Sequence, residues 1–338
     1  MQLGSECPAK LRIEIEKWPF TRPFVISGHI FEFVEVLVVS LESGGKVGRG
    51  EAAGVYYKKD TVSRMANQLE ELRLPIETGI SRGSLQRLLS PGGARNAVDC
   101  ALWDLHSKLV GQPAWQLAGL EKPRPLLTTF TCGADEPEKM AMTARSYVGA
   151  RAIKLKLTGG ASDAERVRAV RDAMGDVWLA VDANQGLSRP ALERLMPTLV
   201  DNGVALIEQP FPVGEEALLD GFQSAIPVAA DESVQTLADL PTLVGRFKVV
   251  NIKLDKCGGL TEGLAMARAA RELGLDVMVG NMLGTSLAMA PAFLVGQLCD
   301  VVDLDGPIFL KADREPNAVY TDGYISCYEE LWGYPFGA

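Results

Sequence analysis

The chain of 338 residues is acidic, with a formal net charge of −9 at pH 7 and a pI near 5.0, which excludes the basic surface that nucleic-acid binding requires. Its hydrophobic fraction of 47% can fill a large core, and its length predicts two domains. Six scattered cysteines and only two histidines exclude a disulfide framework, a zinc knuckle and a histidine-rich metal site.

The sequence shows no signal for export or membrane insertion. Residues 1–6 contain neither the basic segment nor the apolar segment of a signal peptide. The longest apolar run, residues 287–295, contains Pro291 and is too short to cross a bilayer. We therefore expect a soluble cytoplasmic protein without a membrane partner.

Residues 1–122 are predicted to form an α+β domain. Its strands are expected where polar and apolar residues alternate or where β-branched residues gather, at residues 11–16, 33–41 and 47–51. Residues 21–31 contain Pro23 and Gly28, which predict a loop between the first two strands. Helical periodicity follows at residues 60–74 and 94–110. This part of the chain contains no obvious catalytic cluster.

Residues 123–310 are predicted to form a parallel barrel, because short apolar runs alternate there with helical segments. Eight strands are expected, at residues 126–132, 152–156, 178–182, 205–208, 228–231, 250–253, 276–280 and 301–305. Most of these runs end in charged residues, and active sites of parallel barrels lie at the carboxyl ends of the strands. The tail, residues 311–338, is expected to pack back on the first domain.

Three carboxylates fall at the ends of three consecutive predicted strands. Asp182, Glu208 and Asp231 are spaced by about one strand-helix unit each. Neighbouring strands lie about 4.8 Å apart, so these anions would converge on a volume the size of an ion. Anions so close require a cation, and oxygen ligands with room for water and substrate suit Mg²⁺ or Mn²⁺. The alternative is three separate, solvated strand-end acids.

Lysines end the second and sixth predicted strands, which lie opposite each other in an eight-stranded ring. Lys154 and Lys156 share one face of the second strand, and Lys253 ends the sixth. Lys156 and Lys253 would therefore face each other across a bound substrate, as a two-base proton transfer requires. A solvated strand edge would also explain the pair of lysines on one strand, but two opposed inward lysines are costly to bury without a function.

Together these segments resemble the enolase superfamily, muconate-lactonizing-enzyme subgroup. The resemblance rests on residues 94–104 and on the strand-end motifs at 154–156, 182–184, 208–210, 231–233 and 253–259. It implies an α/β fold, with a (β/α)₇β modified TIM barrel and an α+β capping domain that the tail joins. It also implies Mg²⁺-assisted removal of a proton α to a carboxylate by lysine, which is the strategy of this superfamily.

Within the subgroup, Asp303 and Asp305 resemble the D-x-D element of dipeptide epimerases, where two carboxylates hold the substrate's α-ammonium group. Epimerases of the Ala-D/L-Glu type are expected to carry a basic residue in the first loop. Here Ile30 and Phe31 occupy that loop, so we predict that they bind an apolar substrate side chain. Whether Arg22 reaches the pocket stays open, as does the choice between a pocket wall and ordinary packing for Tyr56 and Tyr57.

The resulting hypothesis is a Mg²⁺-dependent dipeptide epimerase, an isomerase in which Lys154 stabilises the enediolate and Lys156 and Lys253 exchange the α-proton. Another reaction of the subgroup is the first alternative: a cycloisomerase, an o-succinylbenzoate synthase or an N-acylamino acid racemase. A barrel retained as a non-catalytic binding protein is the second. The expected partners are a small dipeptide and further copies of the chain in a homo-oligomer.

Overall fold

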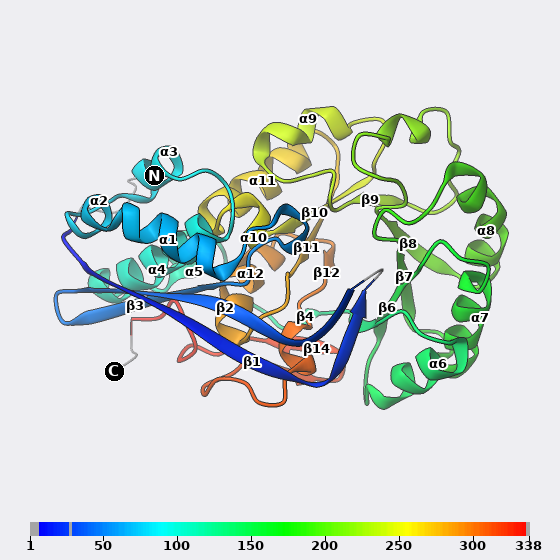
Figure 1. The fold of residues 1–338 in the computed structure, drawn as a ribbon, viewed down its shortest axis with the longest axis horizontal. Helices are drawn as coiled ribbons and strands as arrows, with labels where there is room; N and C mark the ends of the chain where they lie inside the picture. Colours follow the sequence, from blue (N-terminus) through cyan, green and yellow to red (C-terminus); the bar gives the residue numbers. More distant parts are fainter. Residues whose placement is uncertain (1–6, 27–28, 336–338) are drawn as a thin grey trace.

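The computed structural model describes residues 7–26 and 29–335. Its amino-terminal part is a three-stranded antiparallel sheet of β1 (Lys10–Ile26), β2 (His29–Ser43) and β3 (Lys46–Ala52), with helices on one face (Figure 1). These helices are η1 (Tyr56–Lys58), α1 (Val62–Glu71), α2 (Arg73–Glu77), α3 (Arg82–Leu88), α4 (Gly93–Val110) and α5 (Ala114–Leu117). The predicted helix at residues 60–74 is thus divided into α1 and α2.

Helix α4 lies directly on β3 because two glycines of the strand leave no side chain between them. A Cβ atom at Gly50 would lie 2.1 Å from the carbonyl oxygen of Ala97, and one at Gly48 would lie 2.3 Å from that of Ala101. Any larger residue would therefore push the helix away from the sheet. This close contact holds the amino-terminal sheet and its longest helix together as one layered unit.

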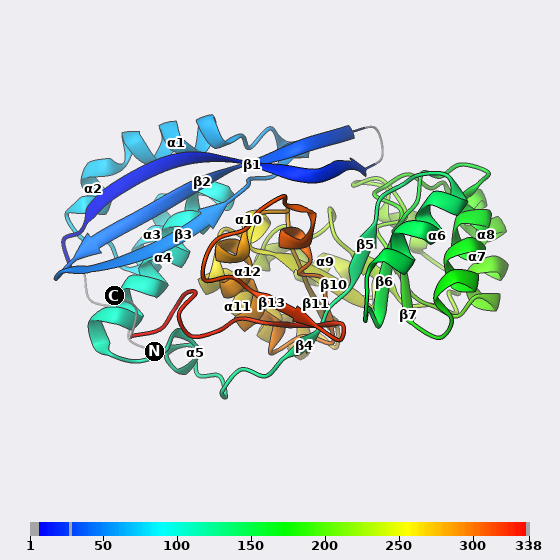
Figure 2. The ribbon, with the colours of Figure 1, turned by 90° about the horizontal axis from the view of Figure 1, so that it is seen from below.

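The loop predicted at residues 21–31 is wrong, because β1 and β2 continue through most of it. Their pairing is interrupted between Pro19 and Phe24 and then resumes, with Phe24 opposite Phe31. Strand β1 is an edge strand, where a bulge can accommodate Pro23 without losing a ladder hydrogen bond. Residues 27 and 28 lie outside the described residues. The hairpin extends beyond α4 toward β5 and β6 (Figure 2).

The second part of the chain is an eight-stranded parallel sheet that curls into a barrel, which confirms the predicted fold class. In spatial order the strands are β5 (Phe130–Cys132), β6 (Ala152–Lys156), β7 (Trp178–Asp182), β8 (Val204–Glu208), β9 (Val228–Ala230), β10 (Val249–Lys253), β11 (Asp276–Gly280) and β12 (Val301–Val302). The two ends of the sheet meet, since Thr129 donates its N–H to the carbonyl of Val302 at 3.0 Å.

Helices cover the outside of the barrel and bury its apolar side chains. They are α6 (Pro137–Ser146), α7 (Asp163–Met174), α8 (Arg189–Asp201), α9 (Leu240–Leu243), α10 (Leu254–Cys257), α11 (Leu260–Glu272) and α12 (Ser286–Gly296), with the 3₁₀ helices η2 (Glu216–Leu219), η3 (Leu237–Asp239) and η4 (Gly306–Phe309). Among the described residues, no helix is both long and apolar enough to cross a membrane.

Three of the predicted barrel strands are shorter than expected, and β9 loses only its last residue, Asp231. Residues 126–132 form two strands in different sheets, because β4 (Leu126–Leu127) pairs with β14 (Tyr324–Ser326), which in turn pairs with β13 (Val319–Thr321). The eighth strand ends at Val302, so Asp303 and Asp305 lie beyond it.

The described part of the tail contacts both the barrel and the amino-terminal sheet. Arg314 donates to Glu16 and Glu51, each at 2.7 Å, and the indole of Trp332 donates to the carbonyl of Arg49. Grouping the tail with residues 1–122 remains a prediction.

Candidate active site

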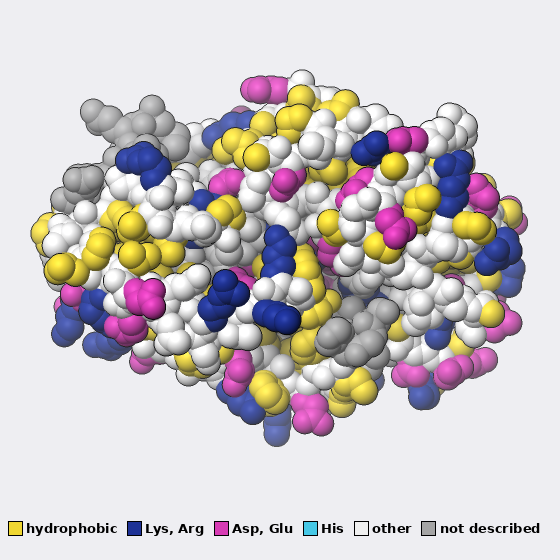
Figure 3. All heavy atoms as spheres, turned by 45° about the horizontal axis from the view of Figure 1, so that its top comes forward, with side chains coloured by type: hydrophobic (Ala, Val, Ile, Leu, Met, Phe, Trp, Pro, Cys, Tyr) yellow, Lys and Arg dark blue, Asp and Glu magenta, His cyan; other side chains and the backbone are white. Residues whose placement is uncertain are grey.

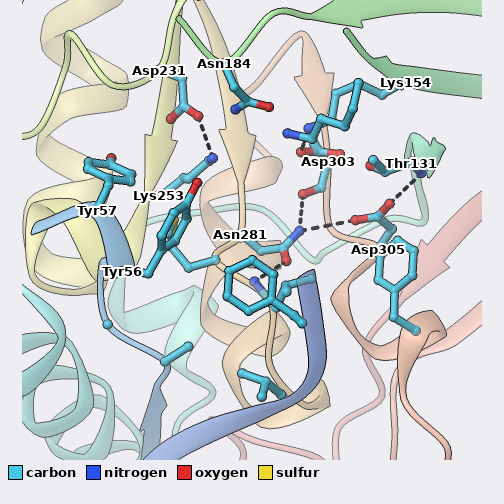
Figure 4. Close-up of a pocket in the computed structure, with 18 of the residues that line it drawn as sticks. Tyr56, Tyr57, Thr131, Lys154, Asn184, Asp231, Lys253, Asn281, Asp303 and Asp305 are labelled. Carbon is cyan, nitrogen blue, oxygen red and sulfur yellow. Dashed lines mark hydrogen bonds and ion pairs between the residues drawn. The ribbon is translucent and has the colours of Figure 1, made fainter. Parts of the chain in front are cut away.

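A cavity of about 280 Å³ opens at the carboxyl ends of the barrel strands, where residues of β2 also line it. The barrel lines it with charged and polar side chains, among them Lys154, Lys156, Asp231, Lys253, Asp303 and Asp305. The amino-terminal part lines it mainly with apolar and aromatic side chains, among them Phe31, Phe33, Val34, Tyr56 and Tyr57. The barrel therefore supplies the charged groups of the cavity, and the amino-terminal part supplies its apolar wall (Figure 4).

The structure brings Asp182, Glu208 and Asp231 together as predicted. One carboxylate oxygen of each lies within 4.8 Å of the others, and all three residues are at most 1% exposed. The parallel register causes this, because Asp182 lies opposite Glu208 on neighbouring strands. Asn251 donates to Glu208 Oε1 at 2.6 Å, whereas Glu208 Oε2 is buried without a hydrogen-bond partner.

Burial and the nearby charge of Asp182 raise the pKa of Glu208 to about 8. A buried oxygen without a donor, within a cluster of three carboxylates, fits a divalent cation that prefers oxygen ligands. The residues present therefore fit Mg²⁺ or Mn²⁺.

Lys156 and Lys253 lie on strands separated by β7, β8 and β9. Lys156 Nζ lies 2.5 Å from Asp182 Oδ2, and Lys253 Nζ lies 2.6 Å from Asp231 Oδ2. Burial alone would lower the pKa of Lys253, but the charges of Asp231 and Glu208 outweigh it and raise the pKa. Both lysines face the cavity, so a molecule bound there would contact cationic groups from two distant strands.

Asp303 and Asp305 also face the cavity, but their partners differ. Asp303 accepts hydrogen bonds from Lys154 and from the hydroxyl of Thr129, a pairing that the sequence did not predict. Asp305 accepts the backbone N–H of Thr131 at 2.7 Å, and Asn281 Nδ2 lies 3.4 Å from its other oxygen (Figure 4). Burial and the charge of Asp303 raise the pKa of Asp305 to about 6.

The hairpin contributes one of the two residues predicted for substrate binding. Phe31 lines the cavity and its ring meets that of Tyr56 edge to face, with 5.6 Å between the centroids. Ile30 is 71% exposed and does not line the cavity, because successive residues of a strand point to opposite faces. Arg22 lies outside this cavity as well, in an adjoining groove that includes Thr131 and Phe309.

Tyr56 and Tyr57 form a wall of the cavity, which settles the alternative left open by the sequence. Their rings are 5.3 Å apart, and Gln235 donates to the Tyr57 hydroxyl at 3.3 Å. Burial and the nearby charge of Glu232 raise the pKa of Tyr56 to about 12. Both phenols are therefore neutral near pH 7 and present an apolar face with a polar edge.

Sequence reasoning missed Glu232, although it lines the cavity and is only 5% exposed. Asn184 Nδ2 lies 3.4 Å from its Oε1, while its Oε2 is buried without a partner. Side chains that alternate along a strand would place Ser233 rather than Glu232 beside Asp231, but the Ser233 hydroxyl donates to Glu216. Alternation fails here because β9 ends at Ala230, before these residues.

Comparisons with known proteins agree with this geometry. Residues 9–119 match the family described as mandelate racemase / muconate lactonizing enzyme, N-terminal domain, and residues 138–329 match the family described as enolase C-terminal domain-like. The L-Ala-D/L-Glu epimerase of Escherichia coli strain K12 is 40% identical over 313 residues, which are 92% of this chain and 97% of that protein.

Two solved structures are similar over nearly the whole chain. An enolase family member from Agrobacterium tumefaciens with homology to dipeptide epimerases, solved with sodium and L-Ala-L-Glu, has a TM-score of 0.93 and 38% identity, covering 96% of this chain and 100% of its own. A dipeptide epimerase from Enterococcus faecalis, complexed with Mg and L-Leu-L-Tyr, has a TM-score of 0.89 and 26% identity, covering 98% and 99%.

Proposed function

The chain belongs to the enolase superfamily, and from that premise we propose that it is a Mg²⁺-dependent dipeptide epimerase. The observation that carries this proposal is the coexistence of three features at one cavity, which Asp231 of the carboxylate cluster lines. These are the carboxylate cluster, a lysine on each of two distant strands, and the acidic pair Asp303 and Asp305. Proteins similar to the chain are named epimerases or racemases, and both are isomerases.

Asp182, Glu208 and Asp231 would hold the metal. When bound, a divalent cation polarises the substrate carboxylate and offsets the negative charge that develops as the α-proton leaves. Lys154 lies 3.6 Å from Glu208 Oε2, where its ammonium adds a second positive charge beside the same developing anion. Mn²⁺ has similar ligand preferences and is expected to replace Mg²⁺.

Lys156 and Lys253 would move the proton. One lysine removes the hydrogen from the α-carbon, and the other returns a proton to the opposite face, which inverts the centre. General acid–base catalysis by such groups contributes about 10²–10⁴-fold to a rate. Because each lysine is the partner of a carboxylate in the cluster, its ammonium is held at the edge of the cavity rather than in solvent.

Asp303 and Asp305 would bind the α-ammonium group of the dipeptide. A cationic group between two buried carboxylates gains a charge-assisted hydrogen bond, whereas an uncharged acylated nitrogen would not offset their charge. Asp305 is oriented by the backbone N–H of Thr131, so one of its oxygens has a fixed position before the substrate arrives.

The side chain of the second residue would meet the wall formed by Phe31, Tyr56 and Tyr57. In the described part of the cavity lining, the cationic side chains are Lys154, Lys156 and Lys253. All three already lie beside carboxylates, so none remains to meet a glutamate side chain. We therefore expect an apolar or aromatic second residue to match or exceed glutamate.

Turnover of a dipeptide series with free and acetylated amino termini tests the proposal. We expect epimerisation of L-Ala-L-Phe and related dipeptides, followed by NMR, and none of their N-acetyl forms. Chelation should abolish activity, and Mg²⁺ or Mn²⁺ should restore it. Turnover of the acetylated forms alone would indicate an N-acylamino acid racemase, and full activity without metal would refute the mechanism.

A further inference from the structure

Two lysines contact Asp231, one at each carboxylate oxygen. Lys253 Nζ lies 2.6 Å from Oδ2, and Lys256 Nζ lies 2.5 Å from Oδ1. Lys253 has a place in the proposed reaction, whereas Lys256 has none so far. The four-residue helix α10 brings both to the same carboxylate, because it turns the chain directly after β10.

The two lysines differ in how firmly they are held. Lys256 also donates to the backbone carbonyl of Asp231 at 2.5 Å and to that of Asn251 at 3.0 Å. An ammonium group has three donors, so those of Lys256 are all used. Its side chain is 1% exposed and lies outside the active-site cavity, whereas the Lys253 side chain is 9% exposed and faces the cavity.

These contacts hold Asp231 at two points. Lys256 binds the residue by its carbonyl oxygen and by Oδ1, and through Asn251 it connects the end of β9 to β10. Rotation of the carboxylate would break the bond at Oδ1 and leave a buried ammonium donor unpaired, which is costly. Oδ2, which accepts a hydrogen bond from the cavity-lining Lys253, is therefore the oxygen on the cavity side.

We infer that Lys256 is a positioning residue that fixes Asp231 with Oδ2 presented to the metal site. This inference rests on the proposed function, since it assigns Asp231 to the metal. A residue that orients a metal ligand through its other oxygen typically changes metal affinity by about 10–100-fold when it is removed. The Lys256 ammonium would also repel a bound cation, which would weaken metal binding. Positioning of Asp231 and repulsion thus have opposite effects on the dissociation constant of the metal.

The experiment is a titration of the full-length protein with Mn²⁺, followed by the EPR signal of free Mn²⁺. We expect Lys256→Met to raise the dissociation constant about 10–100-fold, and Lys256→Gln, which keeps an amide donor, to raise it less. An unchanged constant would mean that Lys256 serves the fold alone. A lower constant would mean that its charge repels the metal. Either result overturns the inference.

A control separates this role from the loss of another lysine that is paired with a carboxylate and a backbone carbonyl. Lys108 donates to Asp104 at 2.9 Å and to the carbonyl of Val47 at 2.7 Å, in the amino-terminal part. Lys108→Met should leave the Mn²⁺ dissociation constant unchanged. Circular dichroism reports folding, and if Lys256→Met does not fold, the Gln variant decides by the same titration. Absence of Mn²⁺ binding by the wild-type protein would instead refute the proposed function.

Discussion

Carboxylates are buried at the mouth of the barrel and also where the amino-terminal sheet meets the barrel, but their partners differ. At the mouth they lie against lysines, and Glu208 and Glu232 each keep one buried oxygen without a donor. At the contact, both oxygens of Glu51 accept bonds from Thr285 and Arg314, and both oxygens of Asp99 accept bonds from Thr261.

The difference separates a functional site from a structural one. Glu51 and Asp99 have protein donors on both oxygens and do not line the active-site cavity, so these two carboxylates contribute to stability. A buried oxygen without a donor costs stability, and such a cost is expected where a ligand supplies the missing partner. Substitutions at the mouth should therefore change activity, and those at the contact should change stability.

The largest effect is expected from the opposed lysines. Lys156→Ala and Lys253→Ala should each abolish epimerisation, because one base remains on one face of the α-carbon. In deuterated water, each variant should exchange the α-hydrogen of one epimer only, and the two variants should be complementary. Rates should fall about 10²–10⁴-fold, so NMR over long incubations is the suitable measurement. Exchange of the same epimer by both variants would contradict the opposed geometry, and Lys108→Ala provides the control.

Removing charge from the carboxylate cluster is the next largest change. Glu208→Gln should lower kcat about 10²–10³-fold, because the counter-charge to the developing anion is reduced. It should not lower the free energy of unfolding in metal-free buffer, since burial already raises the pKa of this carboxyl to about 8 and the amide keeps an acceptor for Asn251. Initial rates at several Mg²⁺ concentrations and urea unfolding measure the two effects. A loss of stability without a loss of activity would show that Glu208 has a structural role and not a functional one.

Where the amino-terminal sheet meets the barrel, Glu51→Ala should lower stability and leave metal binding unchanged. The free energy of unfolding should fall by about 3 kcal/mol, because Thr285 and Arg314 lose a buried acceptor while Arg314 keeps Glu16. Affinity for Mn²⁺ should remain that of the wild-type protein. Urea unfolding and EPR titration give both quantities, and weaker Mn²⁺ binding would show that the two regions are coupled.

The last effect is a pH dependence that concerns Asp255, which accepts the N–H of Gly54 at 2.8 Å across the same contact. Burial raises the pKa of Asp255 to about 7, above its value in the unfolded chain. Ionising it therefore costs the folded state free energy, so stability should fall as pH rises from about 4 to 7, by up to about 4 kcal/mol. Asp255→Asn keeps the acceptor and should remove this part of the decline. Identical pH profiles for the two proteins in urea unfolding would refute it.

Much of the fold and of the site follows from the sequence because parallel strands end at one level. The apolar runs identify β6, β7 and β11 to the residue, and the charges at the strand ends converge as the register requires. The hairpin was mispredicted because Pro23 and Gly28 are local breakers. The bulge that accommodates Pro23 depends on pairing with β2, a partner that local patterns do not identify.

The residues missed at the site lie beyond the ends of strands. Glu232 follows Asp231 after β9 has ended, and Lys256 belongs to a helix of four residues. Side-chain alternation has no meaning in either place. The ion pair between Lys154 and Asp303 joins residues 149 positions apart, and only the closed barrel brings them together.

The contact between the amino-terminal sheet and the barrel also bears on the order in which parts of the chain can fold during synthesis. The amino-terminal sheet leaves the ribosome first, but Glu51 must wait for Thr285, which lies 234 positions later, and Asp99 must wait for Thr261, 162 positions later. At about 5–20 residues per second, the first delay lasts roughly 12–47 s. During synthesis, the nascent sheet therefore holds acids that only the completed barrel can satisfy, and we expect it to become stably ordered after the barrel rather than before it.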